Sequence, residues 1–223
     1  MSTIVADTGI VQVPLALTTL DAFREWIHSD DVPEKTRAHF LDGEVWIDMS
    51  TEQLFSHNQV KNALTIALGG LAMSGGIGRY LPDGILYSNQ LANLSGMPDG
   101  AFYSFDSLRD GKVTFKEGAK GGVTELQGSL DLVIEVVSDS SVKKDRKKRP
   151  KLYFRAGVLE YWLIDARSEP LSFQIFQRGK NRFEAAPERD GWLKSNVFGL
   201  EFRLVSRLDP VGQPEFVLES REG

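Results

Sequence analysis

The chain has 223 residues, 41% of them hydrophobic and none of them cysteine. Its length predicts one packed domain, and the lack of cysteine excludes disulfides, zinc–thiolate sites and thiol nucleophiles and favours a reducing, cytoplasmic location. The net charge of −5 at pH 7 excludes a protein that coats nucleic acid through its overall field, so a local patch would have to bind any polyanion. No window approaches the roughly 18 apolar residues of a membrane span, and no basic segment opens the N-terminus, so we expect neither membrane insertion nor secretion.

The first part of the chain predicts an arm, a helix and a hairpin. Residues 1–17 carry no periodicity and are expected to form the arm, whereas 18–223 are expected to form one domain. Thr18 or Thr19 can cap a helix whose apolar residues recur at helical spacing. An Asp-Gly dipeptide at 42–43 tolerates the positive φ of a tight turn and predicts a short strand on each side.

A second helix and two further strands are predicted next. Residues 50–53 have the form of a capping box, and an apolar stripe at helical spacing continues to about residue 72. His57 falls on the same stripe and is expected to point inward. Strands are predicted over 84–88 and 100–104.

The remaining pattern predicts a hairpin followed by the rest of a sheet. Glycines surround two alternating runs within 110–128, which indicates a protruding hairpin inserted into the domain. A strand over 130–137, a basic helix over about 142–156 and a strand over 160–165 follow, with further strands around 171–177, 182–186 and 201–204. Strands both before and after the two main helices predict an α/β or α+β domain with a mixed central sheet flanked by helices.

The strand over 130–137 carries a carboxylate where an apolar side chain is expected. Its run from Leu132 to Val137 is apolar except for Glu135, which is typical of a strand covered on both faces. A buried carboxylate requires a cation or strong hydrogen bonds, and Mg²⁺ or Mn²⁺ prefers one or two carboxylates with waters and phosphate oxygens. Asp99 and Glu135 are therefore candidate metal ligands. A structural ion pair for Glu135 and a turn role for Asp99 remain as alternatives.

A basic run follows this strand. Seven of the nine residues from Lys143 to Lys151 are cations, enough to contact several phosphates on a chain that is acidic overall. The alternative is a solvated helix face on which Asp145 pairs with a cation one turn later. The candidate nucleic-acid-binding residues are Lys143, Lys144, Arg146, Lys147, Lys148 and Arg149.

Taken together, these motifs resemble the Uma-type restriction endonuclease family, which belongs to the PD-(D/E)XK nuclease superfamily. The resemblance covers most of residues 20–205 and is most specific over 130–165. The residues that carry it are Asp42-Gly-Glu44, the helix with His57, Pro98-Asp99, the strand 131–138, Asp145 followed by Tyr153, and the segment 156–165.

The resemblance implies a restriction-endonuclease-like core in which Asp99 and Glu135 bind the metal and water attacks a phosphodiester. The superfamily pattern has a lysine two residues after the glutamate, and this chain has Val137 there. In the resembled family the cation lies on the following helix, where the usual lysine aligns with Arg149. In that region this chain offers Lys144, Lys147, Lys148 and Arg149. Because arginine remains protonated and is a poor proton shuttle, Lys147 is the first candidate for this role and Lys148 the second.

Two further residues are candidates for the active site on the same grounds. His57 could bond a metal-bound water or the scissile phosphate, and Glu44 could be a third acidic group near the metal. Alternatively, His57 is a hydrogen-bonded core residue and Glu44 is solvated in its hairpin.

The sequence thus leads to the hypothesis of a cytoplasmic Mg²⁺- or Mn²⁺-dependent endonuclease that hydrolyses phosphodiester bonds, with DNA as the expected partner. A homodimer is expected, because closed symmetric pairs are the commonest oligomers and nucleases that cut two strands often work in pairs. The alternatives are a catalytically inactive nuclease fold that binds nucleic acid or regulates, which Val137 and Arg149 favour, and a protein-interaction module.

Overall fold

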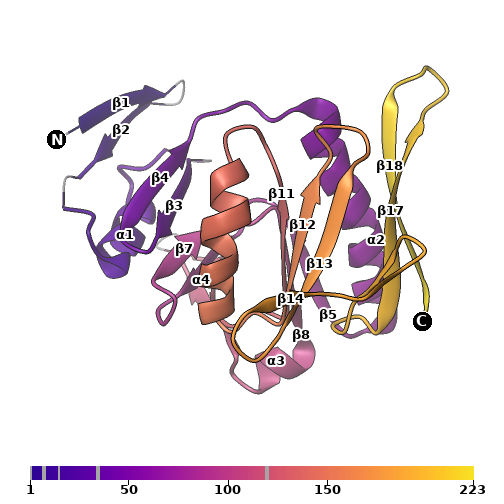
Figure 1. Ribbon diagram of the computed structural model, residues 1–223. Coiled ribbons are helices and arrows are strands. Elements are labelled where there is room, and N and C mark those ends of the chain that lie inside the picture. The colour runs from indigo at the N-terminus through magenta and orange to yellow at the C-terminus, as the bar shows by residue number, and fades with distance from the viewer. Residues whose placement is uncertain (1, 7–8, 15, 34–35, 119–120) are drawn as a thin grey trace.

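The computed structural model describes residues 2–6, 9–14, 16–33, 36–118 and 121–223 (Figure 1). Its centre is a mixed sheet with strand order β14-β13-β12-β11-β8-β5, in which β11 pairs in parallel with β12 and antiparallel with β8. This confirms the mixed central sheet predicted from the sequence. The strands are β5 (Gly78–Pro82), β8 (Gly100–Ser104), β11 (Leu132–Val136), β12 (Glu160–Asp165), β13 (Ser172–Arg178) and β14 (Phe183–Ala185).

Both faces of β11 are covered. Leu132, Ile134 and Val136 face one core, shared with helix α2 (Val60–Gly75) and the C-terminal strands. The alternate residues of the strand face a second core, shared with helix α4 (Arg149–Arg155) and another sheet. Figure 1 shows α2 and α4 on opposite sides of the central strands. Because each fully buried aliphatic side chain contributes about 1.5–3 kcal/mol, this double coverage fixes the strand firmly.

A second six-stranded sheet, with order β4-β3-β7-β6-β10-β9, packs beside α4. The turn between β3 and β4 has positive φ at Asp42 and Gly43, as the sequence predicts. Strands β9 and β10 form the hairpin of 110–128, and β10 also pairs in parallel with β6, so the hairpin is the edge of this sheet. The strands are β3 (Arg37–Leu41), β4 (Glu44–Asp48), β6 (Leu86–Asn89), β7 (Leu94–Gly96), β9 (Val113–Glu117) and β10 (Val123–Gly128).

The two ends of the chain contain several strands that the sequence did not predict, although β17 (Leu200–Leu208) includes the strand predicted around 201–204. The expected arm holds a β1–β2 hairpin, although residues 1, 7, 8 and 15 lie outside the described part. At the other end β17 and β18 form a long hairpin that packs on α2, with β15 and β16 beside it. These strands are β1 (Ser2–Ala6), β2 (Gly9–Val13), β15 (Glu188–Arg189), β16 (Trp192–Lys194), β17 (Leu200–Leu208) and β18 (Pro214–Glu222).

The two short helices follow local capping rules. Helix α1 (Leu20–Ile27) is capped by Thr19, whose hydroxyl accepts a hydrogen bond from the Ala22 N–H at 3.2 Å. Helix α3 (Phe105–Arg109) is capped by Ser104. Among the described residues, none of the helices combines the length and the hydropathy that crossing a membrane requires.

Helices α2 and α4 both begin with a π-helical turn. These turns are η1 (Leu54–Gln59) and η2 (Lys144–Lys148), and each contains hydrogen bonds from residue i+5 to residue i. Gln53 caps η1 by accepting from the Ser56 N–H at 2.6 Å, so the predicted capping box starting at Ser50 is wrong. The wider turns change which side chains share a face, and both turns border the same cavity.

Candidate active site

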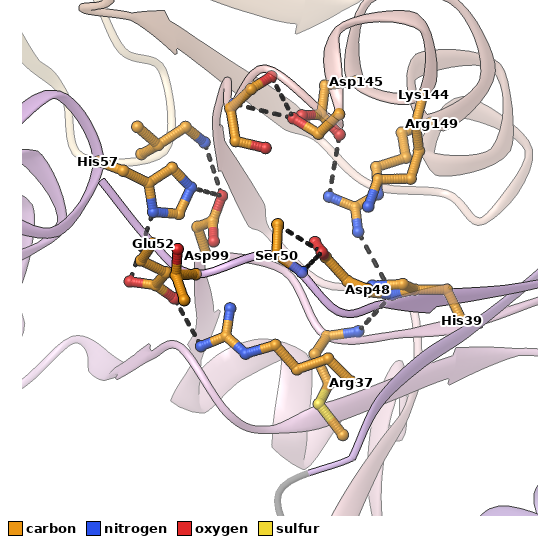
Figure 2. A pocket seen from close by; sticks show the side chains of 15 residues that line it. Arg37, His39, Asp48, Ser50, Glu52, His57, Asp99, Lys144, Asp145 and Arg149 are labelled. Carbon is orange, nitrogen blue, oxygen red and sulfur yellow. Dashed lines mark hydrogen bonds and ion pairs between the residues drawn. The ribbon is translucent and has the colours of Figure 1, made fainter. Parts of the chain in front are cut away.

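A small polar cavity lies where β11 ends, beside the loop that leads into β8 (Figure 2). Its volume is about 40 Å³, and because one water needs about 10–15 Å³ on this measure, it has room for a few waters but not for a nucleotide. The side chains that line it come from β3 and β4, the loop before η1, η1 itself, the loop before β8, the end of β11 with the loop after it, and η2–α4. The lining side chains that could take part in catalysis or bind an ion are His57, Asp99, Glu52, Lys144, Asp145 and Arg149.

Asp99 faces this cavity. Its Oδ2 accepts a hydrogen bond from the Val136 N–H at 2.8 Å, which fixes the carboxylate against the end of β11. His57 Nε2 lies 3.6 Å from the same oxygen, and Lys61 Nζ lies 4.0 Å from Oδ1. Burial alone would raise the pKa of Asp99, but His57 and Lys61 outweigh it and lower the pKa, so the carboxylate is ionised.

His57 points into the cavity from η1, as the sequence predicts for an inward side chain. Its Nδ1 lies 3.5 Å from Glu52 Oε2 but has no hydrogen-bond partner within the described chain. Burial tends to lower the pKa of His57, but Asp99 raises it by more, so the pKa lies above its ordinary value. The positively charged imidazolium is therefore favoured more than in an unperturbed histidine.

Lys61 is a buried cation beside the cavity that the sequence analysis missed. Its Nζ lies 2.7 Å from Glu52 Oε1 and 2.8 Å from Asp83 Oδ2, and Arg37 contacts the same two carboxylates. The overlooked signal was spacing, because Lys61 follows His57 by four residues on the otherwise apolar inward face of the helix.

Glu135 is a strand neighbour of Asp99, since Gly100 pairs with Ile134, but its environment differs. It is fully buried and does not line the cavity. Arg149 forms an ion pair with its Oε2, and the Tyr153 hydroxyl donates to Oε1 at 2.5 Å. Burial raises the pKa of Glu135 well above its usual range, and Arg149 offsets part of this effect.

Arg149 connects this buried pair to the cavity. Its guanidinium lies 3.1 Å from Asp145 Oδ1 and 3.3 Å from His39 Nδ1, as Figure 2 shows. The guanidinium thus supplies the cation that the sequence required near Glu135, although this chain has arginine where the resembled family has lysine.

The π-turn η2 decides which residues of the basic run reach the cavity. Because Arg149 N–H bonds to the Lys144 carbonyl, Lys144, Asp145 and Arg149 face inward together. Lys147 is exposed and Lys148 lies 2.6 Å from Glu44 Oε2, so the structure places these three predicted catalytic residues outside the cavity. The sequence predicted a basic helix over about 142–156, and the structure has the π-helical turn η2 in its first part.

Lys144 is the lysine that the fold brings into the cavity. It is buried, and burial together with the nearby Arg149 charge lowers its pKa. A lowered pKa makes a lysine a better candidate for proton exchange than an ordinary exposed lysine. The other predicted phosphate ligands lie outside: Lys143 is exposed, and Arg146 forms an ion pair with Asp165 at 2.7 Å.

Comparison with known proteins assigns the chain to a family. The family model described as "Putative restriction endonuclease" (Uma2) matches residues 20–205. The chain belongs to the Uma2 family. A crystal structure described as a putative nuclease belonging to DUF820, from Anabaena variabilis, superimposes with a TM-score of 0.60 at 15% sequence identity, covering 81% of this chain and 90% of that chain. It is a likeness of fold, and the search of curated proteins gave no match.

A restriction-endonuclease-like family generally uses divalent metals, so the donor set of this Uma2 protein can be tested for fit. Glu135 does not fit, because both of its oxygens are engaged away from the cavity. Asp99 and Asp145 do fit: both line the cavity, and Asp145 Oδ2 is buried without a hydrogen-bond partner in the described chain. Although no three His, Cys, Asp or Glu side chains form a metal cluster there, Mg²⁺ needs only one or two carboxylates with waters and substrate oxygens.

Proposed function

We propose that this Uma2-family protein hydrolyses phosphodiester bonds in DNA, in the cytoplasm, with Mg²⁺ or Mn²⁺ as its cofactor. The observation that carries the proposal is the convergence of Asp99, His57, Lys144 and Arg149 on one small polar cavity. They come from three separate segments, so no local structural requirement explains their meeting. The family description supports nuclease chemistry.

In this proposal Asp99 and Asp145 would hold the ion. The chemistry that a divalent ion supplies when bound is acidification of water and neutralisation of the charge that develops on the phosphorane. Glu135, which the sequence predicted as a metal ligand together with Asp99, does not contact the ion and instead holds Arg149 in position through their ion pair.

The cavity side chains divide the remaining work. Lys144 Nζ, with its lowered pKa, accepts a proton from the attacking water as the new P–O bond forms. His57, kept cationic by Asp99, donates the proton on Nδ1 to the leaving oxygen as the old P–O bond breaks. Arg149 stabilises the charge on the non-bridging oxygens, for which proton transfer is not needed.

Nicking of supercoiled plasmid with Mg²⁺ or Mn²⁺ tests the activity. We expect Asp99→Asn to lower the rate by about 100-fold or more, the size of loss typical when a group that stabilises the transition state is removed. Asp110→Asn is the matched control, because Asp110 is exposed and remote from the cavity. A wild-type rate in the Asp99 variant would exclude the proposed centre.

Calorimetric titration of Mn²⁺ tests the ligands without relying on activity. We expect binding to the wild type and to Glu135→Gln, and its loss in Asp99→Asn and Asp145→Asn. If the Glu135 variant loses the ion and the Asp145 variant keeps it, the assignment of Asp145 is wrong and the pair predicted from the sequence is right.

One observation favours a second candidate, an inactive nuclease fold that binds nucleic acid. The position of the family lysine is occupied by Arg149, which is committed to Glu135 and Asp145 and cannot shuttle a proton. Salt-sensitive DNA binding without cleavage in either metal would select this candidate.

We also propose a homodimer, in which two cavities could act on two strands. The proposal rests on the frequency of two-fold assemblies. Sedimentation velocity at micromolar concentration tests it, and a single species at the monomer mass of 24.8 kDa would exclude it.

A further inference from the structure

A basic groove lies beside the cavity, between β4 and the η2–α4 segment, with a volume of about 380 Å³. Two carboxylates line it, Asp42 and Glu44. Six cations face them, an excess of four positive charges on a chain whose net charge is −5. The cations are Lys143, Lys144, Lys147, Lys148, Lys151 and Arg155.

The two carboxylates are already paired. Glu44 Oε2 lies 2.6 Å from Lys148 Nζ, and Asp42 Oδ1 lies 3.1 Å from Arg155 Nη2. Lys147 and Lys151 are exposed and form no ion pair within the described part of the chain. The groove therefore has cations available for an external anion. Because the chain is acidic overall, only such a local excess of positive charge could bind a polyanion.

An aromatic ring lies among these cations. Trp46 on β4 is half-buried and lines the groove, with Lys148 Nζ 5.7 Å from its ring centroid. Its indole N–H donates to Glu44 Oε2 at 3.1 Å, which fixes the orientation of the ring. A fixed aromatic ring in a basic groove is the arrangement by which proteins bind single strands, with a base stacked on the ring and phosphates on the cations.

The groove and the cavity are adjacent, because Lys144 lines both of them. A strand bound in the groove thus lies beside the cavity, which is too small for a nucleotide to enter. Stacking on Trp46 requires an unpaired base, since the bases of a duplex are stacked on one another. This favours a single-stranded segment over intact duplex.

We propose that the groove between β4 and α4 binds a single-stranded segment of nucleic acid, with one base stacked on Trp46 and backbone phosphates on Lys147 and Lys151. The segment is thereby led to the cavity of Asp99. Its role as a substrate path rests on the proposed function, whereas the binding itself does not.

Fluorescence anisotropy with labelled single-stranded and duplex DNA of equal length tests the groove. The full chain with Asp99→Asn serves as background, so that cleavage does not interfere. We expect Trp46→Ala to weaken single-strand binding by about fivefold or more, because a stacked base contributes about 1–3 kcal/mol. Trp46→Phe should restore most of the affinity, which a merely misfolded variant could not do. Lys147→Glu with Lys151→Glu should weaken binding and reduce its salt dependence.

Trp192→Ala is the matched control. Trp192 on β16 is also half-buried beneath cations, with Arg203 and Arg221 4.6 Å and 4.3 Å from its ring, but it lies outside the groove. Equal single-strand affinity in the Trp46 and Trp192 variants, or tighter binding of duplex, would overturn the inference. Plasmid nicking without dependence on Trp46 overturns the groove alone, and Trp46-dependent binding without nicking overturns the proposed function alone.

Discussion

Asp99 and Glu135 sit at neighbouring positions of paired strands, yet the fold treats them in opposite ways. Asp99 faces a cavity, with a backbone N–H, His57 and Lys61 around it, and its pKa is lowered. Glu135 is buried between Arg149 and Tyr153, and burial raises its pKa. The comparison teaches that access to water, rather than strand position, separates a carboxylate suited to chemistry from one that holds the scaffold.

The largest effect should come from breaking the buried pair. Glu135→Ala leaves the Arg149 guanidinium without its main partner, and removing one member of a buried ion pair costs about 3–5 kcal/mol of the free energy of unfolding. Asp99→Ala should cost less, because water in the cavity can solvate the groups it leaves. Urea denaturation of both variants measures the difference. A smaller loss for Glu135→Ala than for Asp99→Ala would contradict the division of roles.

A smaller effect should follow from removing the second partner of Glu135. Tyr153→Phe deletes one hydrogen bond to a buried carboxylate, for which we expect a loss of about 1.5–3 kcal/mol. Tyr103→Phe is the control, since that hydroxyl makes no hydrogen bond to the described residues. Thermal denaturation of the two variants should separate them, and equal melting temperatures would mean that Tyr153 only packs.

The smallest effect should be a dependence on pH of the stability that the ion pair between His57 and Asp99 contributes. The pKa of His57 is raised on folding, so the stability that His57 contributes is fully present below its unfolded pKa of about 6.5 and is lost as pH rises through the folded value. We expect His57→Gln to destabilise the protein by about 1 kcal/mol at pH 6, the upper end for an ion pair that solvent reaches, and by less at pH 9. Denaturation across this range measures it.

His39 lines the same cavity and serves as an internal control, because its pKa is lowered where that of His57 is raised. Its Nδ1 accepts from the Met97 N–H at 3.2 Å and faces the Arg149 guanidinium, so the ring is neutral. Burial, together with Arg149, lowers its pKa, and His39 therefore costs stability as pH falls below about 6.5. His39→Gln should remove that loss. Parallel pH profiles for the two histidine variants would show that the local charges do not act as described.

Several elements followed from the sequence because their causes are local. The Thr19 cap, the turn at Asp42 and Gly43, and the strand around Glu135 each depend on residues within a few positions of one another. The strand predicted around 201–204 is part of β17, but its partner β18 was not predicted, although charged residues pair across the two strands.

The sequence by itself determined that a carboxylate would be buried on this strand and that a cation would have to reach it. Only the tertiary structure decided which cation, because the basic run offers several cations at similar separations from Glu135 along the chain. Arg149 reaches Glu135 from 14 positions away and also contacts His39 across 110 positions. The π-helical turn η2 could not be predicted from the sequence either, since one extra residue in a helical turn is imposed by packing and not by propensity. The wider turn brings Lys144 to the cavity together with Asp145 and Arg149, whereas Lys147, two residues before Arg149, is exposed.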